Sequence, residues 1–222
     1  MASSATENEI VLSLISHTNV GKTALARTLL REDVGEVADS AHVTIVPEAF
    51  PLIEKGDLIA TRDSCLKPIK WIGQRAVPGR GNLAPISFEA GALQDATAPL
   101  LVSPQHRMLF TGYEAELLFG EGEVLIHAKF LINGSTVRQN LCEEVTYIHI
   151  MFDDHEIIYA NGQATESFHA DDAGLSAIAD ESREELFSIF PELRWNTGGH
   201  GDTARICLKA HEAKLIAGGA MH

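Results

Sequence analysis

The stretch LLVSPQHRML, from Leu100 to Leu109, combines the two features that decide how the rest of the chain is interpreted. Its first three residues form a short apolar run that suits a buried strand. The strand ends in a Ser-x-x-His sequence, Ser103 to His106. A histidine at such a place is either a proton donor in a reaction or a side chain packed at a strand end.

Further short apolar stretches, separated by Gly, Pro and Asn, lie on both sides of this one. They are residues 57–61, 69–73, 124–126 and 145–152. Many short strands at close spacing favour an all-β domain over a series of βαβ units. Two helices are expected towards the C-terminus, one over Asp171–Phe190, where Pro191 ends the helical spacing, and one over Thr203–Ala217.

The first forty residues differ from the rest in their pattern of apolar and polar residues. An apolar run, Ile10–Ile15, is followed by a polar loop and then by a segment rich in helix formers, Lys22–Arg31. The loop, Ser16 to Thr23 (SHTNVGKT), nearly fits the phosphate-binding pattern GxxxxGK[ST], with Ser16 in place of the first glycine. Ser16, Gly21, Lys22 and Thr23 are therefore candidate phosphate ligands, and Mg²⁺-GTP is the cofactor that they suggest.

Residues 10–44 resemble the opening of a bacterial P-loop GTPase, in which the threonine of the first switch matches Thr44. The resemblance ends there. No DxxG and no [NT]KxD sequence follows, so the chain lacks the motifs that hold the metal and read the base. We interpret residues 1–45 as a fragment of such a GTPase, and we do not expect GTP hydrolysis.

Composition excludes several classes of partner and site. The formal net charge of −14 disfavours binding to nucleic acid or to an anionic membrane surface. Three cysteines without a CxxC pair disfavour a disulfide framework and a thiolate metal site, and no metal centre is expected. The polar N-terminus predicts a cytoplasmic protein by default, although secretion without an N-terminal signal would leave no trace there. The sequence indicates no oligomeric state.

Taken together, the strand stretches resemble the bacterial Hint domain, the fold shared by Hedgehog autoprocessing domains and inteins. The resemblance runs from about Leu52 to Ala217 and places a Hint domain over residues 46–222. In chain order, the stretches that carry it are GDLIAT from Gly56, IKWIG from Ile69, LLVSPQHRML from Leu100, AELLFG from Ala115, VLIHAK from Val124, EVTYIHIMFDDHEII from Glu144 and ESF from Glu166. It implies a mainly β fold with C-terminal helices and a short N-terminal β-loop-α segment.

The resemblance also implies a chemistry and its residues. In this family a cysteine or serine that opens the domain attacks the preceding carbonyl, and a Thr-x-x-His motif assists the cleavage of the peptide bond. Ser103 and His106 match that motif, with serine in the threonine position. His155 matches a late histidine that supports later steps in inteins, although Asp-Asp-His is also a plausible turn. The substrate would be the chain's own polypeptide.

Two departures from the family pattern lower the expected activity. No cysteine lies near residues 34–40, where the domain would open, and Ser40 and Thr44 are the nearest hydroxyls. Residues 164–167 (ATES) stand where inteins have His-Asn, so C-terminal cleavage and full splicing are not expected. The sequence thus predicts an impaired autoprocessing domain. A non-catalytic Hint-fold interaction module and a nucleotide-binding protein are the alternatives.

Overall fold

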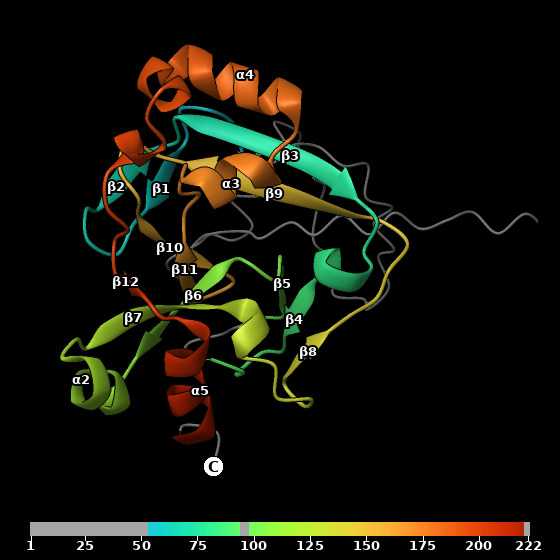
Figure 1. Ribbon diagram of the computed structural model, residues 1–222, viewed down its shortest axis with the longest axis vertical. Helices are drawn as coiled ribbons and strands as arrows, with labels where there is room; N and C mark the ends of the chain where they lie inside the picture. Colours follow the sequence, from blue (N-terminus) through green and yellow to red (C-terminus); the bar gives the residue numbers. More distant parts are fainter. Residues whose placement is uncertain (1–52, 94–97, 220–222) are drawn as a thin grey trace, which may run out of the picture.

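The computed structural model describes residues 53–93 and 98–219, which fold into several small β-sheets with helices at the periphery (Figure 1). The mainly β fold with C-terminal helices is confirmed. The predicted phosphate loop with Ser16, Gly21, Lys22 and Thr23, and the predicted domain boundary at residues 45 and 46, lie outside the described residues. No helix among the residues described is long and apolar enough to cross a membrane.

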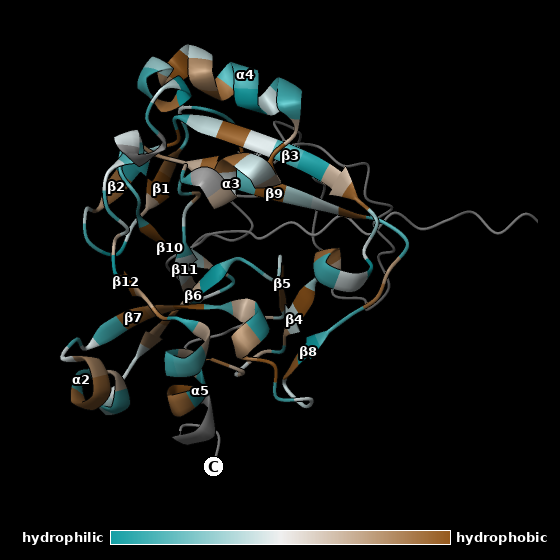
Figure 2. Ribbon diagram, in the orientation of Figure 1, coloured by the Kyte–Doolittle hydropathy of each residue, from teal (hydrophilic) through white to brown (hydrophobic). Residues whose placement is uncertain are grey.

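The largest sheet has five strands in the order β10-β11-β6-β7-β12. The strands are β6 (Arg107–Thr111), β7 (Glu123–His127), β10 (Ile157–Ala160), β11 (Gln163–Glu166) and β12 (Ile206–Cys207). All neighbours are antiparallel except β12, which pairs in parallel with β7. The middle of β7 is apolar and completely buried, as a central strand requires (Figure 2).

A long antiparallel ribbon of β3 (Trp71–Val77) and β9 (Val145–Met151) lies apart from this sheet (Figure 1). Its register pairs Trp71 with Met151 and Gly73 with His149. Three shorter strands form another sheet, in which β4 (Ile86–Phe88) lies between β5 (Leu100–Val102) and β8 (Val137–Gln139). A small hairpin joins β1 (Leu58–Ala60) to β2 (Leu66–Pro68).

The helix expected over Asp171–Phe190 is two helices, so its continuity was wrongly predicted. Asp171 caps α3 (Asp172–Ala177) by accepting a hydrogen bond from the Gly174 N–H at 2.7 Å. Residues 178 and 179 are extended, and α4 (Asp180–Ile189) begins after them. The break is stable because Arg75 donates to the last carbonyl of α3, that of Ala177, at 2.9 Å, and because it lets Ile178 enter the core.

The second expected helix, over Thr203–Ala217, begins later than predicted. The observed helix is α5 (Ala210–Gly219), and the residues before it include strand β12. Pairing with the open edge of β7 prevails over helix propensity here, because the Leu208 N–H donates to the Leu125 carbonyl at 2.8 Å and continues the ladder. One further helix, α2 (Tyr113–Phe119), connects β6 to β7.

Two main clusters of buried side chains hold the elements together. The first lies between the sheets and includes Phe88, Met108 and Ile126, with Leu208 and Ile216 from the C-terminal segment. The second joins Trp71 of β3 to side chains of α3 and α4. The first half of α4 is hydrophilic, and its hydrophobic residues lie in the C-terminal half, where Leu186, Phe187 and Ile189 pack on this cluster (Figure 2).

Candidate active site

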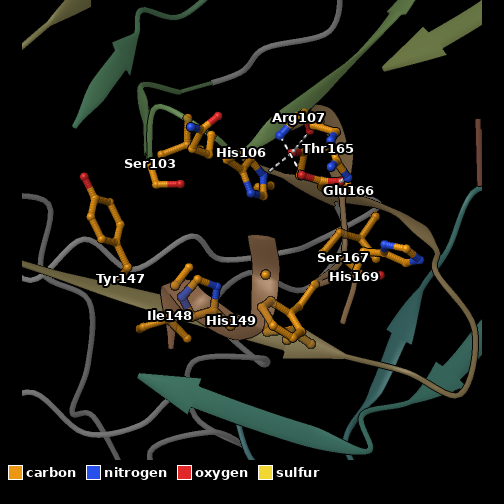
Figure 3. A pocket seen from close by; sticks show the side chains of 18 of the residues that line it. Ser103, His106, Arg107, Tyr147, Ile148, His149, Thr165, Glu166, Ser167 and His169 are labelled. Carbon is orange, nitrogen blue, oxygen red and sulfur yellow. Dashed lines mark hydrogen bonds and ion pairs between the residues drawn. The ribbon is translucent and has the colours of Figure 1, made fainter. Parts of the chain in front are cut away.

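A cavity of 390 Å³ opens between strand β9 and the turn that follows β5. Its wall is mostly apolar, with histidines among the lining residues, including His106, His127 and His149. Figure 3 shows His106 on one side of the cavity, near Thr165, and His149 on the other. Such a concave site with a few converging polar groups is the usual setting for binding or catalysis.

The Ser-x-x-His sequence forms a turn that is anchored by the chain after β7. The His106 N–H donates to the Ser103 carbonyl at 3.0 Å, which closes the turn. The His106 carbonyl accepts from the Ala128 N–H at 2.8 Å, and the Pro104 carbonyl accepts from the Lys129 N–H at 3.2 Å. The backbone therefore fixes the place of the imidazole, and both Ser103 and His106 line the cavity.

The His106 side chain is held by Thr165 on strand β11. The imidazole Nε2 and the Thr165 Oγ1 are hydrogen-bonded, and Oγ1 also donates to the Arg107 carbonyl at 3.0 Å. Burial lowers the pKa of His106, although the nearby Glu166 carboxylate opposes the shift. The ring is therefore uncharged at neutral pH and can accept a proton.

Ser103 is brought to the same wall without forming a dyad with His106. Among the residues described, its hydroxyl makes no hydrogen bond to the imidazole; its carbonyl holds the histidine backbone instead. Figure 3 shows Ser103 at the cavity, which Tyr147 also lines. The hydroxyl is placed to contact a bound group.

Behind His106 lies a buried ion-pair network centred on Glu166, which begins the ESF stretch but was given no role from the sequence. The Glu166 carboxylate accepts from the Arg107 backbone N–H at 2.8 Å and from its guanidinium at 3.0 Å. The same guanidinium lies 3.4 Å from Asp171. Burial opposes ionisation of Glu166, but the hydrogen bond from His155 and the neighbouring positive charges outweigh it and hold the pKa of Glu166 below its usual value.

His155 lies on the far side of Glu166 and is not among the residues that line the cavity. Its side chain is completely buried. Nδ1 accepts from the Ala204 N–H at 2.9 Å, so Nε2 carries the proton and points to Glu166 and to the Ser167 carbonyl, each at 3.2 Å. His155 therefore contacts Glu166, and Glu166 in turn holds Arg107 next to His106.

His149 is a further imidazole of the cavity, and its position there was not foreseen. It lies on β9, with its ring 5.2 Å from that of Phe168. Burial, together with His106 and Arg75 nearby, lowers the pKa of His149 to about 4. The one available signal was a histidine between apolar residues of a strand (YIHIM, Tyr147–Met151).

The described residues contain no cluster of three or more histidine, cysteine, aspartate or glutamate side chains arranged to hold a metal ion. The charged groups around the cavity pair with one another. The arrangement can move protons and bind an uncharged backbone segment.

Comparison with known proteins identifies the family of the domain. The model of the Hint domain family matches residues 49–172, which include Ser103, His106, His155, Thr165 and Glu166. No curated protein and no solved structure shows a significant match. The matched region leaves out residues 10–44, whose likeness to a GTPase stays a prediction, and does not identify the Hint domain as a bacterial one. Since the match covers more than half of the chain, the chain belongs to the Hint domain family.

Proposed function

We propose that the cavity around His106 promotes rearrangement of a peptide bond in the chain's own polypeptide, an autoprocessing reaction. The observation that carries this proposal is the imidazole of His106, fixed by its backbone and by Thr165 at the wall of a cavity large enough for a short peptide segment. Proton transfer by a positioned side chain typically accelerates a reaction by about 10² to 10⁴.

The reaction would proceed by acyl transfer. A hydroxyl or thiol gives its proton to His106 as it attacks the carbonyl carbon. The C–N bond then breaks, and His106 returns that proton to the leaving amide nitrogen. The product is an ester or thioester with a free amine. Ser103 lies beside the same cavity and supports the bound backbone through its hydroxyl, while His155 acts through Glu166 and not on the substrate.

The identity of the nucleophile sets the expected rate. Residues 34–40 contain no cysteine, and the hydroxyls of Ser40 and Thr44 lie outside the described residues. A hydroxyl with an ordinary pKa is a far weaker nucleophile than a thiolate. We therefore expect slow self-cleavage, and we expect no splicing because residues 164–167 supply no asparagine to cyclise.

The test is the intact mass of the full-length chain followed over days, with and without dithiothreitol or hydroxylamine. We expect a shorter product whose new N-terminus identifies the nucleophile, and we expect His106→Ala to abolish it. His211→Ala is the matched control, because His211 is exposed on α5. A single species of 24.1 kDa under every condition would instead support a non-catalytic interaction module.

Nucleotide binding at residues 16–23 is a separate proposal that rests on the sequence of the phosphate loop alone. Mg²⁺-GTP should then raise the melting temperature of the full chain by mass action on the folded state. Lys22→Ala should remove the increase. An unchanged melting temperature with the unaltered chain would remove this alternative.

A further inference from the structure

We infer that Thr165 is a positioning residue that fixes the tautomer of His106, so that Nδ1 and not Nε2 exchanges protons with a group bound in the cavity. The inference deepens the proposed function, since it names the nitrogen that would carry out the proton transfer. Its basis is the hydrogen-bond pattern around one buried hydroxyl.

Thr165 Oγ1 has three polar neighbours and only one proton. It lies within hydrogen-bonding distance of His106 Nε2, 3.0 Å from the Arg107 carbonyl oxygen and 3.5 Å from the Met108 sulfur. A carbonyl oxygen can only accept, and it is a stronger acceptor than a thioether. The proton of Thr165 therefore points to Arg107, and the remaining contact is satisfied when His106 Nε2 donates to Oγ1.

The other nitrogen of His106 is then the acceptor of the ring. A neutral imidazole carries one proton, so a protonated Nε2 leaves a lone pair on Nδ1. Within residues 53–93 and 98–219, Nδ1 has no hydrogen-bond partner, and His106 lines the cavity. The lone pair is thus available to a bound group.

Strand β11 holds this arrangement rigidly. Thr165 is 2% exposed and pairs with Met108 of β6. Two consecutive side chains of β11 bind both backbone groups of Arg107: Thr165 donates to its carbonyl, and Glu166 accepts from its N–H. These two contacts hold the end of β11 against the backbone of Arg107 and keep the Thr165 hydroxyl beside His106.

Nδ1 then takes part in both proton transfers of the reaction, from the nucleophile and to the leaving amide nitrogen. Nδ1 accepts the proton as the nucleophile's O–H or S–H bond breaks and its bond to carbon forms. It returns that proton to the amide nitrogen as the C–N bond breaks. The ring keeps its Nε2–H bond to Thr165 throughout, so no rotation of the imidazole is required.

The experiment reads the tautomer directly, by long-range proton–nitrogen NMR spectra of the full-length chain labelled at histidine nitrogen. His106→Gln assigns the signals. In the unaltered chain at neutral pH we expect a protonated Nε2, slow to exchange with water, and an unprotonated Nδ1. Thr165→Ser should preserve this spectrum. Thr165→Val, which has the same shape without the hydroxyl, should give fast exchange of that proton and a mixture of tautomers.

A second readout separates this inference from the proposed function. Where self-cleavage occurs, Thr165→Val should slow it at least tenfold and Thr165→Ser less than threefold, at equal melting temperatures. A protonated Nδ1 in the unaltered chain, or an unchanged spectrum in Thr165→Val, would overturn the inference. Absence of cleavage alone would overturn only the proposed function, because the tautomer is measured without it.

Discussion

Glu166 binds Arg107 at two atoms, accepting from the backbone N–H with one carboxylate oxygen and from the guanidinium with the other. The pair is buried, with side-chain exposures of 14% for Arg107 and 9% for Glu166. A pair of this kind contributes little compared with an apolar replacement, but losing one partner leaves a buried charge uncompensated. Its role is to position the residues next to His106.

Glu166→Gln should therefore lower the free energy of unfolding by about 3 kcal/mol, the cost of leaving the Arg107 charge without its main partner. Urea denaturation measures this change. Glu89→Gln is the matched control, because Glu89 pairs with Arg138 at the surface, where such a pair contributes under about 1 kcal/mol. Equal losses in both variants would contradict the role assigned to Glu166.

Acid should destabilise the fold through His149. Its pKa is lowered to about 4 in the folded chain against an ordinary 6.5, so the unfolded chain binds more protons between these values. The contribution of His149 to the free energy of unfolding is fully present above pH 6.5. It falls by roughly 2–3 kcal/mol as the pH drops to about 4. His149→Gln should lose less stability over that range than the unaltered chain in urea titrations at several pH values. His211→Gln, altered at an exposed site, should behave as the unaltered chain does.

Gly73 is required by the packing of Trp71. A Cβ at position 73 would overlap the indole ring, and that ring is 1% exposed and packed 5.4 Å from the Phe168 ring. Gly73→Ala should cost about 2 kcal/mol through overpacking. Gly122→Ala, where a Cβ meets nothing within 4 Å, should leave the melting temperature nearly unchanged. A tolerated Gly73→Ala would show that Trp71 has room to move.

Arg205 fastens β12 to the rest of the sheet. Its guanidinium binds Glu123 and Asp63, each at 2.7 Å. Removing it in Arg205→Met should release β12 from β7, because the strand has only two residues of its own. Hydrogen exchange of the Leu208 N–H, which donates to Leu125, should accelerate at least tenfold. Unchanged exchange would mean that α5 alone holds the segment.

The sequence predicted the elements whose signals are local. The apolar run before Ser103 forms strand β5 (Leu100–Val102), as the pattern indicated. A helix begins at Asp171, where the sequence placed its start, and Asp171 caps it. Each of these features depends on a few adjacent residues.

The residues that were not foreseen depend on contacts between distant parts of the chain. Thr165 meets Arg107 across 58 positions, and no periodicity within β11 marks its hydroxyl as a partner for His106. The same limit explains the helices. The expected helix is interrupted at Ile178 because this side chain packs in a core with Trp71 and Leu186. Ile206 lies in a strand because β7 offers an open edge to pair with.

Strand β12 also has a consequence for synthesis. It completes the edge of β7 from about 80 residues further along the chain, while ribosomes add about 5–20 residues per second. The nascent chain therefore carries an unprotected edge of β7 for several seconds or more after that strand has emerged, even when most of the family-matched region is already made. Exposed edges recruit other strands. This chain should accordingly depend on holdase chaperones during translation, and a ribosome stalled near residue 200 should yield aggregates.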